Sequence, residues 1–419
     1  MRLRCLCAVL AVVPSLASAL DIDWSGFATV GYAMSDKPYR YQRFVDDGGT
    51  FARDSVLGLQ LDARLAPTLG ATVQLRVAPA DDSDSGWEPS LAWAFLSWRP
   101  LDDMLLRAGK LRIPLMLNTE NHDVGVTYPF ARLPAEVYST APTSDIFGAM
   151  FSKTWWRGEQ EWSLDGYYGK ASAYQRLYFR VAAGQPENRA VYDPTRMKGG
   201  GLVLSLRHGD DLYRLGAHRI ETRRRQGEIN ADFPFTLLPS PPYQPGEGFY
   251  DISRAPQSSR TISRLLSLGA SVGLPAGFRL SGEYVRLLND GAVNGWDRWA
   301  AYAALSRAIG AWTPYVSYAR MQSGGQVLRR YEAVVDNRVS IPSPLIDASQ
   351  RAVADSLLAH EQSTLALGTA YRLNAGTLLK AEWAHTRTGT VSSFIDAPAG
   401  SDSADRRLNV FSLSASFSF

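Results

Sequence analysis

Residues 408–419 read LNVFSLSASFSF, and apolar and polar side chains alternate in them with a period of two. In residues 411–419 every odd position is apolar and every even position is serine. Because successive side chains of a β-strand point to opposite faces, this segment predicts a strand with two unlike faces. Such a strand is typical of a transmembrane barrel, whose wall has lipid outside and water inside. A sheet strand of a secreted β-protein is the alternative for this segment alone.

The same segment resembles the carboxyl-terminal signal of outer-membrane β-barrel proteins, which ends in phenylalanine. With a first predicted strand that begins at Trp24 and an even number of strands, we expect residues 408–419 to pair with that strand and close the barrel. The serine face would then line the lumen, and the phenylalanine face would contact lipid.

Alternation of this kind recurs along the chain, most clearly in residues 55–65, where the odd positions from 57 onward are leucine or alanine. The predicted fold is all-β, a transmembrane antiparallel β-barrel of about 16 strands, with 14 or 18 strands as alternatives. The predicted strands are residues 24–34, 55–65, 71–77, 91–98, 105–111, 146–155, 162–170, 202–207, 212–220, 262–272, 278–287, 298–307, 312–321, 364–372, 377–385 and 408–419.

Short and long connections alternate between these strands. Tight turns such as Pro67-Thr68-Leu69 and Asn374-Ala375-Gly376 contain residues that tolerate turn dihedrals. This order predicts short periplasmic turns and long extracellular loops. The predicted long loops lie near residues 35–53, 79–90, 112–144, 173–200, 222–259, 288–297, 322–362 and 388–404.

Residues 1–19 have the features of an export signal: a basic start, an apolar core and a small-residue cleavage site at Ala17-Ser18-Ala19. Both cysteines of the chain, Cys5 and Cys7, lie in this segment. We therefore expect residues 20–419 to form a single barrel domain without thiols, located in the outer membrane of a Gram-negative bacterium. The net charge of +3 falls to +1 without Arg2 and Arg4, which gives no indication of a nucleic-acid partner.

The long connection at 112–144 is predicted to fold inward and to constrict the barrel. It contains Pro114, Pro129, Pro134 and Pro142, which stiffen it, and charges of both signs. A stiff, charged segment is suited to a pore constriction. The residues predicted for this constriction are Lys110, Arg112, Glu120, His122, Asp123, Arg132, Glu136 and Asp145.

This connection follows the fifth predicted strand, as does the inward-folded loop of general bacterial porins. The phrase GKLRIP at 109–114 is similar to the strand that leads into that loop in several porin families. The continuation Asp123-Val124-Gly125, Tyr128-Pro129-Phe130 and Arg132 to Tyr138 resembles porin-like proteins of proteobacteria. The resemblance implies a channel, and a homotrimer as its assembly.

Strand parity predicts which charged side chains face the lumen, because a charge facing lipid at mid-bilayer costs roughly 2 to 4 kcal/mol for arginine or lysine. A basic wall facing an acidic loop would set up a transverse field. For Lys110 parity is ambiguous, because Arg107 and Lys110 cannot both face inward in a regular strand, and Gly109 is a candidate bulge. The predicted pore-wall residues are Arg64, Arg76, Arg207, Arg214, Arg279, Glu283, Lys380 and Glu382.

The sequence contains no convincing enzyme motif. His385 near Glu382 and Ser363 lacks a nucleophile motif, and the acidic run that starts at Asp81 has alanine where an EF-hand needs glutamate. We predict no catalytic residues, no metal site and no cofactor.

The function expected from these features is passive diffusion of small hydrophilic solutes or ions through a water-filled barrel. A channel that prefers an anion or a sugar is the first alternative, because the predicted wall is rich in arginine. A closed barrel whose loops at 222–259 and 322–362 bind a surface or partner is the second. Outer-membrane lipid and lipopolysaccharide are the expected surroundings.

Overall fold

The computed structural model describes residues 21–141, 143–180, 189–225, 229–230, 257–258, 260–290, 297–335, 337, 350–351, 354–398 and 401–419. The predicted export signal at 1–19, residue 142, most of the loop at 222–259 and part of the loop at 322–362 lie outside these residues.

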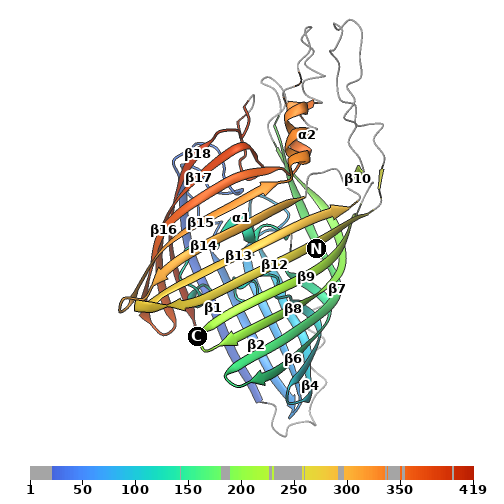
Figure 1. Ribbon diagram of the computed structural model, residues 1–419, viewed down its shortest axis with the longest axis vertical. Coiled ribbons are helices and arrows are strands. Elements are labelled where there is room, and N and C mark those ends of the chain that lie inside the picture. Colours follow the sequence, from blue (N-terminus) through green and yellow to red (C-terminus); the bar gives the residue numbers. More distant parts are fainter. Residues whose placement is uncertain are drawn as a thin grey trace, which may run out of the picture.

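The described part of the chain contains a closed antiparallel barrel of 16 strands (Figure 1), which confirms the predicted fold. Each strand pairs with the next along the chain, and a separate two-stranded sheet joins β10 (Ile229–Asn230) to β11 (Gln257–Ser258). The barrel strands are β1 Asp21–Ser35, β2 Val56–Ala66, β3 Leu69–Pro79, β4 Trp87–Leu101, β5 Met104–Arg112, β6 Asp145–Arg157, β7 Gln160–Phe179, β8 Arg189–His208, β9 Asp211–Arg224, β12 Thr261–Leu274, β13 Phe278–Asp290, β14 Arg298–Arg307, β15 Trp312–Ser323, β16 His360–Asn374, β17 Thr377–Ser392 and β18 Arg407–Ser418.

The terminal strand closes the barrel as its alternation predicts. β18 pairs antiparallel with β1, from Phe27 opposite Ser418 to Ser35 opposite Val410. Phe419 and Gly26 exchange two backbone hydrogen bonds of 2.8 and 3.0 Å, so the pairing continues to the last residue. Closure leaves neither strand with an unpaired edge.

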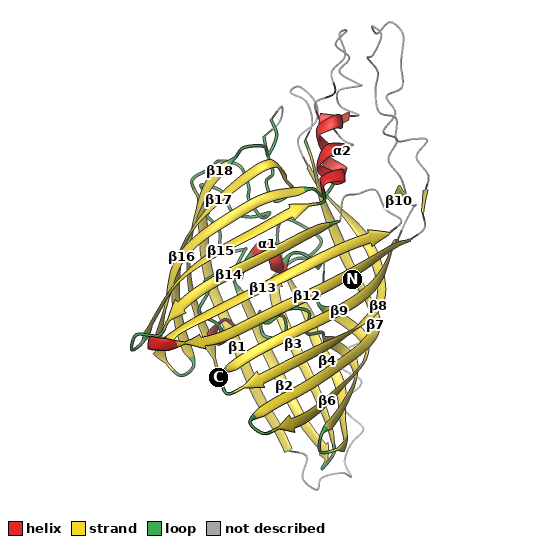
Figure 2. Cartoon of the chain, viewed as in Figure 1, coloured by secondary structure: helices red, strands yellow, loops and turns green. Residues whose placement is uncertain are grey.

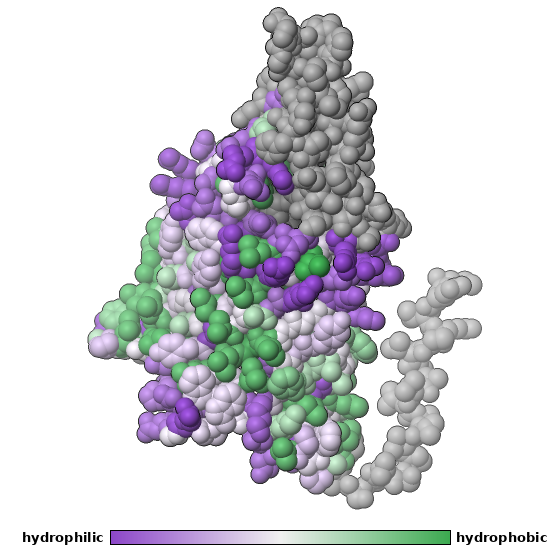
Figure 3. Space-filling model, turned by 45° about the vertical axis from the view of Figure 1, so that its right-hand side comes forward, coloured by the Kyte–Doolittle hydropathy of each residue, from purple (hydrophilic) through white to green (hydrophobic). Residues whose placement is uncertain are grey.

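The outer surface of the barrel is apolar over much of its height. Leu57, Leu75, Leu202, Leu266 and Leu413, on strands around the barrel, are 50–60% exposed and point away from the lumen. Figure 3 shows apolar residues over the middle and lower part of one face, with hydrophilic residues gathered above them. No helix among the described residues is both long and apolar enough to span a membrane.

Short helices occur in the connections (Figure 2): α1 (Ala135–Tyr138), η1 (Gly125–Thr127), η2 (Pro275–Gly277) and α2 (Gly325–Val335). The turns at one end of the barrel span two to four residues, whereas the other end carries the long connections. Residues 113–144, which contain η1 and α1, connect β5 to β6 and are called the inner loop below.

The predicted loop at 173–200 is wrong in its extent, because β7 and β8 continue through most of it. Pro194 and the glycines at 199–201 are unusual in a strand, so the sequence pattern did not predict this part of β8. Its pairing with β7 nevertheless runs from His208 to Arg189 without a break. Near the end of this tall hairpin, Arg176 pairs with Asp84 at 2.8 Å and with Asp396 at 2.6 Å. These ion pairs tie the hairpin to two of the long connections.

Candidate functional site: the inner loop and the passage beside it

The inner loop lies inside the barrel and is bonded to the wall opposite β5. The backbone N–H of Leu117 donates to Glu283 on β13 at 2.8 Å, and that of Ala131 donates to the Tyr315 hydroxyl on β15 at 2.9 Å. Lys380 on β17 donates to the Phe130 carbonyl at 2.9 Å. In Figure 2, α1 is seen within the barrel. The inner loop therefore covers the inward faces of β12–β17, which we call the sealed wall.

Apolar side chains fix the inner loop against the sealed wall. Ile113, Leu115, Met116, Phe130 and Val137 of the loop are buried in one cluster with inward residues of β12–β15. The Phe130 ring meets those of Tyr302 and Tyr315 edge to face, with centroids 6.4 and 5.1 Å apart. Burial of this kind stabilises by about 25 cal/mol for each Å² of apolar surface removed from water.

Glu283, predicted to face lumen water, is instead buried at the centre of this contact. Its carboxylate accepts hydrogen bonds from the Tyr138 hydroxyl at 2.6 Å, the Tyr302 hydroxyl at 3.0 Å and the backbone of Leu117. Lys380 and Glu382 likewise point inward but are only 5% and 8% exposed. Strand parity correctly predicted that these three side chains point inward. It could not predict their burial, because the inner loop that covers them is not part of the strand pattern.

Glu136 also needs correction, since it was predicted for the constriction. It lies in α1, is 2% exposed, and accepts hydrogen bonds from Gln362 at 2.7 Å and Thr364 at 2.5 Å on β16. This carboxylate attaches the inner loop to the sealed wall and does not face the open side.

A polar cavity of about 450 Å³, called the passage below, lies on the other side of the inner loop, beside the place where Gly125 of the loop touches Thr29 and Ser416. Its opposite side is the inward faces of β1–β3 and β18, called the open wall, with Thr29, Val56, Arg76, Ser414 and Ser416. Six basic and four acidic residues line it: Arg43, Arg53, Arg76, Arg112, Arg132, Lys380, Asp54, Asp81, Asp123 and Asp145. Arg112, Asp123, Arg132 and Asp145 among these were predicted for the constriction.

Arg112 organises the loop side of this passage. Its guanidinium donates to Asp123 at 2.8 Å and to Asp145 at 2.8 Å. Asp123 also pairs with Arg76 of the open wall at 3.5 Å and with the His122 imidazole at 3.2 Å. Burial raises the pKa of Asp123, but His122, Arg112 and Arg76 lower it more, so its pKa lies well below the ordinary value of 3.8.

Arg132 pairs across the passage with Asp54 at 2.8 Å. The charges on the two sides of the passage therefore alternate. The acidic Asp123 of the loop faces the basic Arg76 of the open wall, whereas the basic Arg132 of the loop faces the acidic Asp54. The predicted polarity of a basic wall facing an acidic loop is thus only half correct. Sequence reasoning missed Asp54, Arg53 and Arg43, which lie in the connection from β1 to β2. The adjacent charges of Arg53 and Asp54 beside a strand start were the available signal.

The remaining predicted wall residues lie elsewhere. Arg214 faces inward and donates to the Met116 carbonyl at 2.7 Å and to Glu120 at 3.4 Å, so these two predicted residues come together away from the passage. Arg64, Arg207 and Arg279 lie at the short-turn end, where Arg64 pairs with Asp21 and Arg279 with Asp211. They are too far along their strands to meet the inner loop.

Lys110 is on the outer face of the barrel, contrary to the prediction. It pairs in the sheet with Phe147, which is 71% exposed on that face. Gly109 has a φ of +136°, and a Cβ there would lie 2.2 Å from the Ala94 carbonyl oxygen, so only glycine fits. The pairing nevertheless runs through Gly109 without a shift, so no bulge turns Lys110 inward.

Two features considered in the sequence have other partners in the structure. His385 pairs with Asn409 at 2.9 Å on the outer side, whereas Glu382 points inward three positions earlier, so the two cannot act together. Asp81 and Asp84 lie near arginines, at 4.0 Å from Arg76 and 3.3 Å from Arg43. Among the described residues, no group of three or more His, Cys, Asp or Glu could hold a metal ion.

Comparisons with known proteins agree with this architecture. Residues 242–390 match the model of a family described as Gram-negative porin. No curated protein matches the chain. The in-vitro folded trimer form of OmpT, an outer membrane protein of Vibrio cholerae, is 11% identical, with a TM-score of 0.53 and coverage of 96% of this chain and 100% of that one.

Two further solved structures share the fold. The outer membrane channel DcaP of Acinetobacter baumannii is 9% identical, with a TM-score of 0.53 and coverage of 95% of this chain and 97% of its own. An anion-selective porin from Comamonas acidovorans is 15% identical, with a TM-score of 0.51 and coverage of 96% and 100%. The barrel fold along the chain is therefore that of outer-membrane channels and porins, and residues 242–390 match the Gram-negative porin family model.

Proposed function

We propose that this barrel is a porin that allows passive diffusion of small hydrophilic solutes and ions, with the inner loop as its constriction. The observation that supports this proposal is the polar passage between the inner loop and the open wall, lined by charged groups from both sides. Fixed charges at close quarters favour polar solutes over apolar ones. The rigid attachment of the loop to the sealed wall would keep the width of the passage constant.

An anion preference is the finer form of this proposal. The passage has six basic and four acidic lining residues. Asp123 is already shared by Arg76, Arg112 and His122, which leaves little free negative charge near it. An excess of positive charge lowers the energy of an anion in a narrow passage.

Planar-bilayer recording of the purified full-length protein tests both statements. We expect stepwise conductance increments and, in a KCl gradient, a reversal potential displaced toward the chloride equilibrium potential. Absence of conductance steps from folded barrel would overturn the channel. Steps with a reversal potential on the potassium side would overturn only the anion preference.

The assembly and maturation of the protein are further parts of the proposal. Residues 1–19 would be removed as an export signal, and residues 20–419 would form a single domain that assembles as a homotrimer. Mass spectrometry of the protein purified from outer membranes should show a mature chain that starts near Leu20. Cross-linking in those membranes should give a trimer band.

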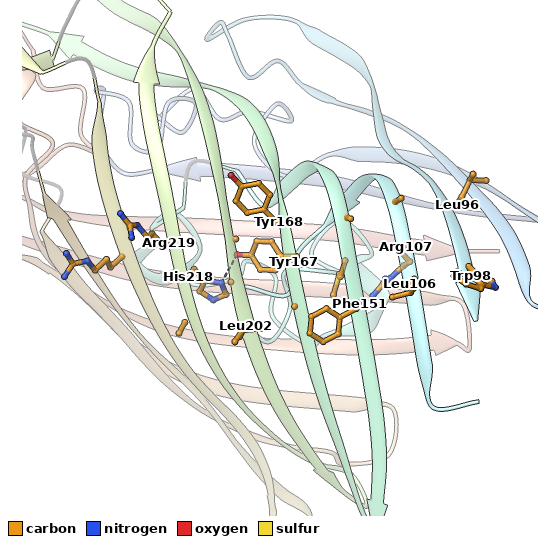
Figure 4. A pocket seen from close by; sticks show the side chains of 18 of the residues that line it. Leu96, Trp98, Leu106, Arg107, Phe151, Tyr167, Tyr168, Leu202, His218 and Arg219 are labelled. Carbon is orange, nitrogen blue, oxygen red and sulfur yellow. Dashed lines mark hydrogen bonds between the residues drawn. The ribbon is translucent and has the colours of Figure 1, made fainter. Parts of the chain in front are cut away.

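The outer face carries a surface suited to phosphorylated lipid such as lipopolysaccharide. An apolar groove of about 1190 Å³ crosses β4–β9 and β12, with Trp98, Phe151 and Tyr168 among its lining residues (Figure 4). Ala108, Ala149 and Gly200 also line it, and Arg219 and Arg264 lie on its side toward the long loops. Acyl chains would fill the groove, and phosphate would meet the arginines. Loss of bound lipopolysaccharide after exchange of both arginines for methionine would support this assignment, and unchanged binding would refute it.

A further inference from the structure

A second cavity, of about 250 Å³, lies inside the barrel at the long-loop end. Residues 139–141 of the inner loop cover it, and Phe394 of the connection between β17 and β18 also lines it. The wall beneath presents the apolar side chains of Met197, Ile220, Leu265 and Leu287 from β8, β9, β12 and β13, beside hydroxyl groups of these strands. This cavity would meet a solute before the passage does, because the long loops face the exterior.

Arg298, the first residue of β14, lines this cavity without an anionic partner. It is 9% exposed, and its Nη2 reaches only the carbonyl oxygens of Ser139 at 3.4 Å and Thr140 at 3.2 Å. Its Nε is buried and has no hydrogen-bond partner. The other two guanidinium groups of the cavity, on Arg43 and Arg176, both pair with Asp84. Among the described residues, no carboxylate is within ion-pair distance of Arg298.

His360, the first residue of β16, brings a second unsatisfied nitrogen to the same cavity. His360 is 3% exposed, its ring lies tilted against that of Phe394 with centroids 4.7 Å apart, and its Nδ1 is buried without a hydrogen-bond partner. Its backbone N–H donates to the Ser323 hydroxyl at 2.9 Å, and Ser323 lies opposite Arg298 in the sheet. Burying a charge or polar group without a partner is costly, so the Arg298 Nε–H indicates a missing acceptor beside this cavity, and the His360 nitrogen a missing hydrogen-bonding partner.

We propose that this cavity binds a small organic anion in which one carboxylate is attached to an apolar body. The carboxylate would accept hydrogen bonds from Arg298, whose planar guanidinium matches its two oxygens, with His360 beside it. The apolar body would contact Leu265 and Leu287. This inference rests on the proposed channel and names a solute class for it.

Isothermal titration of the detergent-folded full-length protein with benzoate tests the site. Acetate, which lacks the apolar body, and benzyl alcohol, which lacks the charge, should each bind at least about tenfold more weakly than benzoate. Arg298→Met should weaken benzoate binding by about tenfold or more, because it removes the charged donor. Arg286→Met is the matched control, since Arg286 lies opposite Leu266 and Trp299 on the outer face, and it should bind like the wild type.

A second variant tests the site independently in case Arg298→Met does not fold. Ile220→Trp fills the cavity, leaves Arg298 in place, and should also weaken benzoate binding. Wild-type affinity in either folded variant would overturn the site, as would equal binding of acetate and benzoate. In bilayers, benzoate added on the long-loop side should block the wild-type current transiently. Conductance without benzoate binding would overturn this inference alone, whereas benzoate binding without conductance would support the site and overturn the channel.

Discussion

The two sides of the inner loop differ in what the inward-pointing wall residues meet. On the sealed wall, Glu283 and Glu382 are buried and satisfied by tyrosine hydroxyls. On the open wall, Arg76 pairs with Asp123 across a polar passage. Both sets occupy lumen-facing positions of regular strands. The difference shows that parity determines the direction of a barrel side chain, whereas the path of one loop determines whether it meets water or protein.

Of the substitutions that test this difference between the two walls, removal of Glu283 from the sealed wall should have the largest effect. Glu283→Ala leaves two tyrosine hydroxyls and the Leu117 N–H without their acceptor, which we expect to lower the free energy of unfolding by about 3 to 5 kcal/mol. The inner loop should loosen, so single-channel conductance should rise and become noisier. Thermal denaturation in detergent and bilayer recording measure the two effects.

Glu283→Gln is the control, because its amide oxygen keeps an acceptor in place and should preserve most of the stability. If Glu283→Ala melted at the wild-type temperature with unchanged conductance, the loop would not depend on the sealed wall.

Removal of Arg112 affects the passage side of the loop and should lower the free energy of unfolding by less than Glu283→Ala does. Arg112→Met leaves Asp123 and Asp145 without their shared guanidinium, although Asp123 keeps Arg76 and His122. We expect a loss of about 2 to 3 kcal/mol, measured by denaturant titration at pH 7. Stability equal to that of the wild type would show that the ion pairs contribute nothing to holding the loop.

The same contact has a defined dependence on pH. The pKa of Asp123 is depressed, so its stabilising contribution is present above the unfolded value of 3.8 and is lost as the pH falls through its lower folded value. The stability difference between wild type and Asp123→Asn should persist from about pH 8 to 5 and should shrink below about pH 4. A difference that already shrank near pH 6 would contradict the depressed pKa.

Smaller effects on permeation should follow from the charges that face the passage. Arg132→Ala should shift the anion-to-cation permeability ratio toward cations, and Asp54→Ala toward anions. A change of roughly two- to fivefold is expected, since a unit charge near a passing ion changes its energy by up to about 1 kcal/mol in water. Reversal potentials in a KCl gradient give the ratio, and shifts in the same direction for both variants would refute the assignment.

The smallest effect is expected at Lys110. Lys110→Met removes a charge from the outer face, where its sheet neighbour Phe147 is exposed, and should leave the reversal potential unchanged. A shift as large as that of Arg132→Ala would place Lys110 in the passage after all.

These residues also show what the sequence could predict. The barrel, its closure through residues 408–419 and the inward direction of Arg76, Arg214 and Glu283 follow from a period of two, which is a property of each strand alone. The burial of Glu283 and Lys380 depends on contacts with the inner loop from more than 140 positions away, which no local pattern contains. Lys110 was misassigned because a glycine at positive φ looks like a bulge in sequence, although the pairing here stays regular.

Accessibility of single cysteines tests the division of the lumen most directly, because the described part of the chain contains no cysteine. Val56 on β2 lines the passage, and Ala300 on β14 is 0% exposed beneath the inner loop, although both point inward. In the folded protein, Val56→Cys should react quickly with a charged methanethiosulfonate reagent and its current should fall, whereas Ala300→Cys should stay unmodified. Equal modification rates at the two positions would contradict a sealed wall and an open wall on opposite sides of one loop.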